Sequence, residues 1–253
     1  MITLRSKAEV ARIKAACQIV SETLEYLEEF IEPGISTLEL DKKAENFIKK
    51  SGGIPAFKGY RGFPANICVS INEVVVHGIP SNRILRAGDI VSIDVGVKLN
   101  GYYGDAAATF PVSEVSAEAL ELIFVTKRSL YEGIAMARPD NRLYDISNAI
   151  QQRVEESGFA VVREFVGHGI GSRMHEDPQI PNFGEPGVGP RIKEGMVFAI
   201  EPMVNLGAHK VEILEDGWTA VTKDRKLSAH FEHTVYIGEK GAEILTEWQK
   251  KKL

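Results

Sequence analysis

Cysteine is scarce in this sequence of 253 residues. Only Cys17 and Cys68 are present, too few for a disulfide framework, and no Cys-x-x-Cys pair is available for zinc or redox chemistry. Long apolar runs are absent too: no stretch reaches membrane-spanning length, and the N-terminal residues lack the apolar centre of a signal peptide. We therefore expect a cytoplasmic protein that has no membrane partner.

An excess of positive charge is also missing. The chain carries 30 Lys and Arg against 35 Asp and Glu, a formal net charge of −5. A nucleic-acid binder needs a basic surface to release counterions, so we expect no specific nucleic-acid partner, and we interpret the basic tail 250–252 as a solvated end. With 44% hydrophobic and 26% charged residues, the composition is that of an ordinary globular protein.

The segment around Asn100-Gly101 gives the clearest local prediction. This dipeptide separates two apolar runs, 89–99 and 102–110, as in a β-hairpin whose type I′ turn needs positive φ at both central residues. Because side chains alternate between the faces of a strand, Asp94 and Asp105 are expected diagonally on one face. Like charges in an apolar sheet repel unless a cation lies between them, which favours a metal site; a solvated face is the alternative.

Two pairs of helices are predicted, one before the hairpin and one after it. Capping boxes of the Ser-x-x-Glu type begin the first two helices at Ser6 and Ser36, and the first is expected to end near Pro33-Gly34. Apolar residues at three- and four-residue steps predict a third helix that stops before Pro139 and a fourth that stops before 157–158.

The pattern of elements repeats along the chain. The second helix pair follows the first at an offset of 106 residues, and the strand segment 88–94 is echoed by 195–201 at an offset of 107. We therefore predict two similar halves, approximately 1–110 and 111–253, related by a pseudo-twofold axis. The expected fold class is α+β, with both halves in one domain that spans residues 1–253.

Acidic residues in the second half extend the candidate metal site. Glu201 occupies the position that corresponds to Asp94 in the repeat. Glu232 lies in a strand-like alternation over 229–237, where an unpaired carboxylate would cost several kcal/mol to bury. A structural salt bridge is the alternative for Glu232.

The histidines differ in their surroundings. Glycines flank His168, which leaves its imidazole accessible, and His175 follows seven residues later, so a ligand is favoured over a core histidine. His77 ends an apolar run before a Gly-Ile-Pro turn, which would present its ring to a cleft. We expect His230 and His233 at the surface or beside the ligands rather than as ligands.

Taken together, five residues resemble the metal ligands of the methionine aminopeptidases: Asp94, Asp105, His168, Glu201 and Glu232. The segment 165–170 followed by His175 is specific to that family, and the resemblance extends from the first helix to about residue 237. It implies the pita-bread fold, in which two pseudo-twofold-related halves surround a curved antiparallel sheet, and it is closest to the short bacterial type I members without an N-terminal extension.

The resemblance implies removal of the N-terminal methionine from nascent proteins and peptides with a small second residue. A hydroxide held by two divalent ions, Mn²⁺, Fe²⁺, Co²⁺ or Zn²⁺, would attack the scissile carbonyl. Glu201 would act as general base and then acid, His175 would hydrogen-bond the oxyanion, and His77 would bond the substrate amide. Since Ile2 is not small, the chain is expected to retain Met1.

The resemblance also implies an apolar pocket for the methionine side chain. Its expected walls are Tyr60, Phe63, Cys68, Met174 and Trp218, with Phe57 near the entrance. Met174 and Phe183 depart from the residues that are commonest in the family. The expected partners are N-termini of nascent polypeptides, at the ribosome or after release, and a monomer is the default expectation.

Two other functions remain open from the sequence. One is an X-Pro peptidase of the same fold, against which the chain length and the loop around Tyr60 argue. The other is a catalytically inactive relative that binds peptides or the ribosome. Such relatives usually lose metal ligands, whereas this chain keeps all five together with His77 and His175.

Overall fold

The computed structural model describes residues 2–247. Met1 and residues 248–253 lie outside the described part, so the retention of Met1 and the solvated basic tail stay predictions. Within the described part, no helix is long and apolar enough to cross a membrane.

Residues 2–247 form four α-helices, as the capping and apolar patterns predict. They are α1 (Lys7–Glu28), α2 (Thr37–Lys50), α3 (Ala117–Met136) and α4 (Leu143–Glu156). Both predicted capping boxes are present, at Ser6 and Ser36. Helix α1 ends at Glu28, so the predicted end near Pro33 is wrong. After Glu28 the chain forms a turn, in which the Phe30 N–H donates to the Leu27 carbonyl (3.0 Å). This turn lets Phe30 pack against the hydrophobic core.

All the paired strands in the described residues are antiparallel. The main sheet has nine strands in the order β1-β4-β5-β14-β9-β7-β8, with β15 beside β14 and β2 beside β4. Two three-stranded sheets, β13-β10-β6 and β11-β12-β3, complete the structure. The strands are β1 (Ile54–Pro55), β2 (Cys68–Ile71), β3 (Val74–Val76), β4 (Ile90–Leu99), β5 (Tyr102–Pro111), β6 (Ala160–Val161), β7 (Gly167–Gly169), β8 (Glu176–Ile180), β9 (Val197–Ile200), β10 (Met203–Asn205), β11 (Val211–Ile213), β12 (Ala220–Thr222), β13 (Ser228–His230), β14 (Glu232–Gly238) and β15 (Gly241–Ile244).

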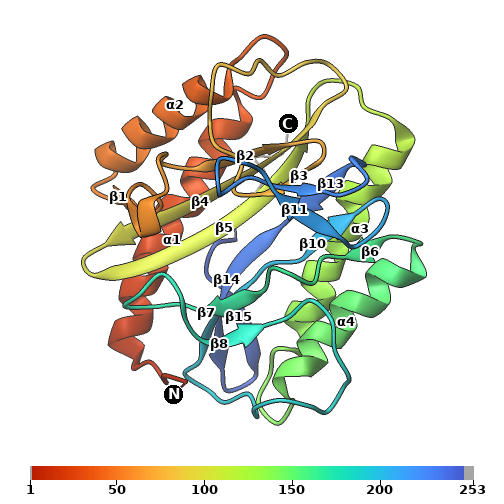
Figure 1. Cartoon of the computed structure of the whole chain (residues 1–253). Helices are drawn as coiled ribbons and strands as arrows, with labels where there is room; N and C mark the ends of the chain where they lie inside the picture. Colours follow the sequence, from red (N-terminus) through yellow and green to blue (C-terminus); the bar gives the residue numbers. More distant parts are fainter. Residues whose placement is uncertain (1, 248–253) are drawn as a thin grey trace.

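The predicted hairpin is confirmed in its register. Leu99 pairs with Tyr102, and φ is +49° at Asn100 and +84° at Gly101, as a type I′ turn requires. The two long strands β4 and β5 curve through the centre of the molecule (Figure 1). The predicted strand over 229–237 is interrupted at Phe231, where the chain passes from β13 in a small sheet to β14 in the main sheet.

The repeat is visible in equivalent contacts of the two halves. Ile54 of β1 pairs with Lys98 of β4, and Ala160 of β6 pairs with Asn205 of β10, at offsets of 106 and 107 residues. Helix α1 lies against β4 and β5, and α2 lies beside α1 and β1, while α3 and α4 lie beside the strands of the second half (Figure 1). The α+β class with two related halves is therefore confirmed, and the strands of both halves meet where β5 pairs with β14.

Candidate metal centre and substrate pocket

The central hairpin holds two carboxylates on one face. Gly96 pairs with Asp105 and Asp94 pairs with Ala107, so the two aspartates are diagonal neighbours. The Thr234 side chain of β14 fixes the position of Asp105: its hydroxyl donates to the Asp105 carbonyl (2.8 Å) and accepts from the Asp105 N–H (3.1 Å). The first half thus supplies two acids from its central hairpin, and the second half holds one of them in place through Thr234.

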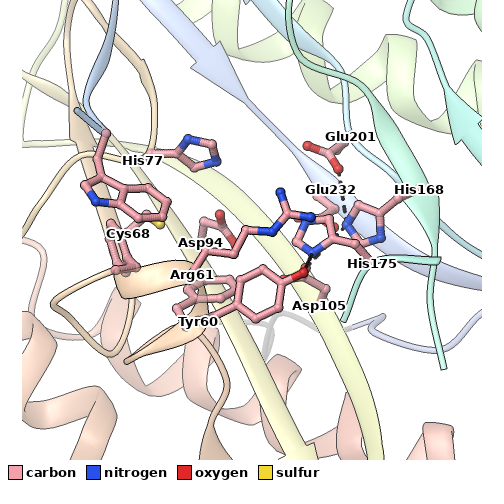
Figure 2. Close-up of a pocket in the computed structure, with 13 residues that line it drawn as sticks. Tyr60, Arg61, Cys68, His77, Asp94, Asp105, His168, His175, Glu201 and Glu232 are labelled. Atoms are coloured by element: carbon pink, nitrogen blue, oxygen red, sulfur yellow. Dashed lines mark hydrogen bonds and ion pairs between the residues drawn. The ribbon is translucent and has the colours of Figure 1, made fainter. Parts of the chain in front are cut away.

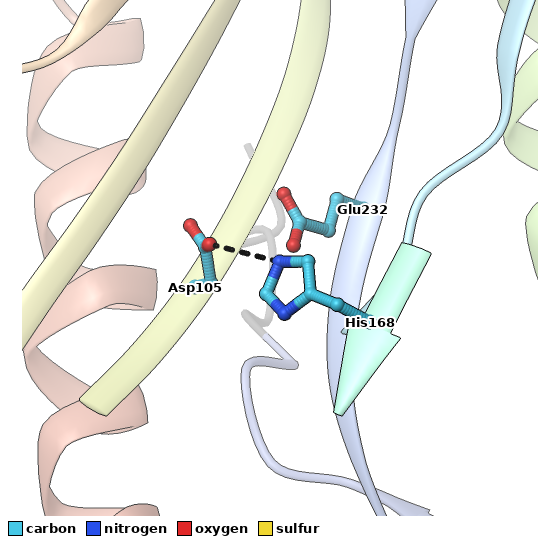
Figure 3. Close-up of side chains that lie close together, drawn as sticks. All are labelled: Asp105, His168 and Glu232. Atoms are coloured by element: carbon cyan, nitrogen blue, oxygen red, sulfur yellow. Dashed lines mark ion pairs between the residues drawn. The ribbon is translucent and has the colours of Figure 1, made fainter. Parts of the chain in front are cut away.

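The second half supplies three more groups to the same place. His168 on β7 pairs with Ala199 of β9, Glu201 follows β9 directly, and Glu232 begins β14 (Figure 2). The His168 Nε2 lies 3.5 Å from Glu201 Oε1 and 3.8 Å from Asp105 Oδ2. One ligand atom from each of Asp105, His168 and Glu232 can be chosen so that all lie within 4.8 Å of one another (Figure 3).

Burial makes this cluster of acids unfavourable without a cation. Burial raises the pKa of the Asp94 carboxyl to about 7, and burial together with the charges of neighbouring acids raises the pKa values of Asp105 and Glu232 well above the usual range. Among the described residues, one oxygen of each of these three carboxylates is buried without a hydrogen-bond partner. Within residues 2–247, the basic side chains within 4 Å of the acids of this cluster are the neutral histidines His168 and His230, and no Lys or Arg forms an ion pair with Glu232, so the salt-bridge alternative is not supported for Glu232.

His168 has the state that a metal ligand requires. Burial lowers the pKa of its imidazole to about 4, so the ring is neutral. Its Nδ1 lies 2.9 Å from the Gly169 carbonyl, which can only accept, so Nδ1 carries the proton and Nε2 presents a lone pair to the acids. Four carboxylates and one neutral imidazole are a set of donors that suits divalent cations.

A pocket opens next to the acids (Figure 2). Its wall away from the acids is largely aromatic, with Phe63 and Trp218 edge to face at a centroid distance of 5.2 Å. The residues that line it are Phe57, Tyr60, Arg61, Phe63, Cys68, His77, Asp94, Asp105, His168, His175, Glu201, Trp218 and Glu232. Met174 is not part of this lining; it packs behind it, in the apolar cluster that also contains Phe57 and Cys68.

Two histidines reach the pocket from opposite sides. His175 lies over the candidate metal ligands, with its ring centroid 4.1 Å from that of His168 and its Nδ1 2.9 Å from the Tyr60 hydroxyl. Burial and nearby histidines lower the pKa of His175 to about 3, so its ring is neutral. His77 packs edge to face against Phe165 at 5.4 Å, and burial lowers its pKa as well.

His230 and His233 were expected at the surface or beside the ligands; the structure excludes the surface for both and places His230 beside the candidate ligands. His230 and His233 are 2% and 3% exposed, so neither lies at the surface. His230 is covered because β13 pairs with β10, and its Nε2 lies 3.9 Å from Glu201 Oε2. His233 is covered on the other face of β14, where its Nδ1 lies 3.0 Å from the Thr246 hydroxyl.

One lining residue, Arg61, was missed by the sequence analysis. It belongs to a short 3-10 turn, Tyr60–Gly62, and has a left-handed backbone with φ of +50°. Its guanidinium lies 5.5 Å from the centre of the Tyr60 ring (Figure 2). The only signal in the sequence was a charged residue between an aromatic residue and a glycine.

The Cys68 thiol also lines the pocket. Burial beside Asp94 raises the pKa of this thiol well above the usual range, so Cys68 forms part of the pocket wall and is not a nucleophile.

Comparisons with known proteins agree with this geometry. Residues 11–239 match the model of metallopeptidase family M24. The chain is 56% identical over 246 residues to a methionine aminopeptidase of Clostridium perfringens, a match that covers 97% of this chain and 99% of the relative.

Solved structures give the same relationship. The structure of a methionine aminopeptidase from Rickettsia prowazekii superposes with a TM-score of 0.97 at 42% identity, covering 98% of this chain and all of the other. A prolidase from Pyrococcus furiosus shares the fold with a TM-score of 0.80 at 25% identity; the match covers 98% of this chain but only 66% of the prolidase. The chain therefore belongs to metallopeptidase family M24 and, within that family, to the methionine aminopeptidases.

Proposed function

We propose that this protein removes the N-terminal methionine from peptides and nascent proteins whose second residue is small. The observation that carries the proposal is the placement of four carboxylates, two buried and two half-buried, and a neutral imidazole at one end of a largely aromatic pocket. The family match supports a peptidase that depends on divalent metal, and the identity to methionine aminopeptidases supports methionine as the residue removed.

The metal ligands in this proposal are Asp94, Asp105, His168, Glu201 and Glu232, and they hold two divalent ions. Four negative charges balance two dications, which relieves the repulsion that otherwise raises the pKa values of these acids. When bound, such ions polarise a carbonyl and lower the pKa of water towards about 7. The candidates are Mn²⁺, Fe²⁺, Co²⁺ and Zn²⁺.

Three residues of the chain move or stabilise charge during the reaction. Glu201, whose pKa burial and Asp94 raise, takes a proton from water and passes it to the leaving amine. With the Tyr60 hydroxyl donating to His175 Nδ1, the His175 Nε2–H is free to donate to the developing oxyanion. His77, on the far side of the pocket, bonds the substrate amide.

The apolar wall selects the first side chain of the substrate. Tyr60, Phe63, Cys68 and Trp218 surround an unbranched thioether, with Phe57 beside them. Met174 supports this wall from behind, so it acts on the shape of the pocket and not through contact with substrate.

The remaining features of the proposal concern the whole protein. Residues 1–253 act as one catalytic domain whose site needs ligands from both halves. The substrates are N-termini of nascent polypeptides in the cytoplasm, at the ribosome or after release, and the protein acts as a monomer.

A peptide-cleavage assay tests the proposal. The protein is stripped with a chelator and titrated with each of the four metals, and release of methionine from Met-Ala-Ser is compared with cleavage of Ala-Pro-Ala. We expect metal-dependent release from Met-Ala-Ser only. Cleavage of Ala-Pro-Ala would favour the X-Pro peptidase, and no turnover with any metal would favour an inactive peptide-binding relative.

A further inference from the structure

The loop that carries His175 has no regular structure of its own. It connects β7 to β8 over residues 170–175. Within the loop the Gly171 N–H donates to the Arg173 carbonyl (3.2 Å), and at its start the Ile170 N–H donates to the Val197 carbonyl (3.2 Å) and the Gly171 carbonyl accepts from the Tyr103 N–H (2.9 Å). On the pocket side, the His175 ring is hydrogen-bonded to the Tyr60 hydroxyl and stacks on the Tyr60 ring. The loop therefore needs support from outside the pocket.

Glu176, the next residue after His175, closes the loop on that outer side. Its Oε1 accepts from the Arg173 N–H (2.9 Å) and from the Ser172 hydroxyl (3.2 Å). The Glu176 side chain is only 5% exposed, although its partners Ser172 and Arg173 lie at the surface. Its second oxygen, Oε2, accepts from the Arg5 guanidinium. Arg5 thus holds the Glu176 carboxylate, which in turn is hydrogen-bonded to loop residues Ser172 and Arg173.

Arg5 reaches this place from the segment that precedes α1. Its backbone N–H donates to the Gly195 carbonyl (2.7 Å), and its Nη1 donates to Glu9 Oε1 (3.2 Å) in the first turn of α1. Its side chain is 6% exposed. The guanidinium also lies flat against the loop at Gly171, where a Cβ atom would come within 2.4 Å of Nη2. Arg5 therefore contacts both ends of the loop, and its buried charge is balanced by two acids.

We propose that Arg5 is a positioning residue for the reaction: through Glu176 it fixes loop 170–175 and thereby the imidazole of His175 over the proposed metal ligands. This inference rests on the role proposed above for His175. The His175 ring lies 4.1 Å from the ring of His168, so a small shift of the loop changes its distance to the reacting carbonyl. A displacement of about 1 Å in a group that acts on the reaction costs roughly 100-fold in rate.

The test compares Arg5→Met, which keeps volume but removes the charge, with Arg5→Lys, which keeps the charge. Lys14→Met is the matched control. It also removes an ion pair of a basic residue, here between Lys14 of α1 and Glu243, but in this pair the two side chains are 58% and 51% exposed. In metal-free protein, amide exchange of residues 171–176 should be about 10- to 100-fold faster in Arg5→Met, as expected for loss of a charge-assisted hydrogen bond. Arg5→Lys should restore part of the protection, and Lys14→Met should leave it unchanged.

With metal restored, Arg5→Met should lower kcat for Met-Ala-Ser about 10- to 100-fold, with KM and bound metal unchanged. In a His175→Ala background, Arg5→Met should cause no further loss. If Arg5→Met does not fold, Glu176→Gln provides the same comparison, because it weakens the pair while keeping its shape.

Two results would overturn the inference. One is unchanged exchange of residues 171–176 in Arg5→Met or Glu176→Gln. The other is a loss of kcat that is as large in the His175→Ala background as in the wild type, which would mean that Arg5 does not act through His175. Failure of the wild type to release methionine would instead reject the proposed function, while the exchange experiment on metal-free protein would still decide whether Arg5 holds the loop.

Discussion

Replacing Asp94 by Asn should stabilise the metal-free protein. Burial raises the pKa of Asp94 to about 7 from its ordinary value of 3.8. Because the folded-state pKa is raised, the stability that a protonated Asp94 provides is complete below about pH 4 and is lost as the pH rises to about 7. Asn resembles the protonated acid and does not ionise, so the difference in stability between Asp94→Asn and the wild type should grow over this range.

The magnitude follows from the two pKa values. Their difference corresponds to about 4 kcal/mol above pH 7, and about 2–4 kcal/mol is expected because pocket water reaches part of the carboxylate. At about 2–4 °C for each kcal/mol, the melting temperature of metal-free Asp94→Asn should exceed that of the wild type by roughly 5–15 °C at pH 8. At pH 5 the difference should be about half as large or less.

Thermal unfolding in the presence of a chelator, followed by circular dichroism between pH 5 and pH 8, measures this difference. Glu243→Gln is the control, since it removes a carboxylate that is 51% exposed and lies outside the pocket. Added Mn²⁺ should stabilise the wild type much more than Asp94→Asn. The reasoning is wrong if metal-free Asp94→Asn is less stable than the wild type at pH 8, or if the difference does not change with pH.

Three further substitutions have defined outcomes. His175→Ala should lower kcat by about 100- to 1,000-fold while bound metal, measured by elemental analysis, is retained; equal loss of both would reassign His175 as a ligand. Gly104→Ala should destabilise the protein by about 1–3 kcal/mol in urea unfolding, because the added Cβ would lie 2.7 Å from the backbone nitrogen of Cys17; an unchanged midpoint would show that α1 can move away from β5. Met174→Ala should cost about 2–5 kcal/mol of stability and change the ratio of rates for methionine and norleucine substrates; an unchanged ratio would mean that Met174 does not shape the pocket.

Local rules were sufficient for the hairpin and the helix starts. Asn100-Gly101 specifies the turn, and strand alternation then places Asp94 and Asp105 on one face without any knowledge of the rest of the chain. The capping boxes at Ser6 and Ser36 are equally local. The end of α1 was not predictable in the same way, because the packing of Phe30 against the core decides where the helix stops.

Long-range packing decided the parts of the site that the sequence did not indicate. His230 is buried because β13 pairs with β10, a contact between segments more than twenty residues apart. Arg61 lines the pocket through a left-handed turn that no sequence pattern requires. Met174 was expected in the pocket wall by resemblance, and its place behind that wall follows from how the loop before β8 packs on Gly96.

The sequence by itself determined the types of elements, the repeat and the identity of the acids, since these depend on periodicity, turn chemistry and the cost of burying charge. Only the tertiary structure decided that Asp105, His168 and Glu232 present ligand atoms within 4.8 Å of one another, and that Arg5 reaches the loop beside His175. The physical reason is that these distances depend on how strands from the two halves pair and pack, and such contacts join residues that are far apart in the chain.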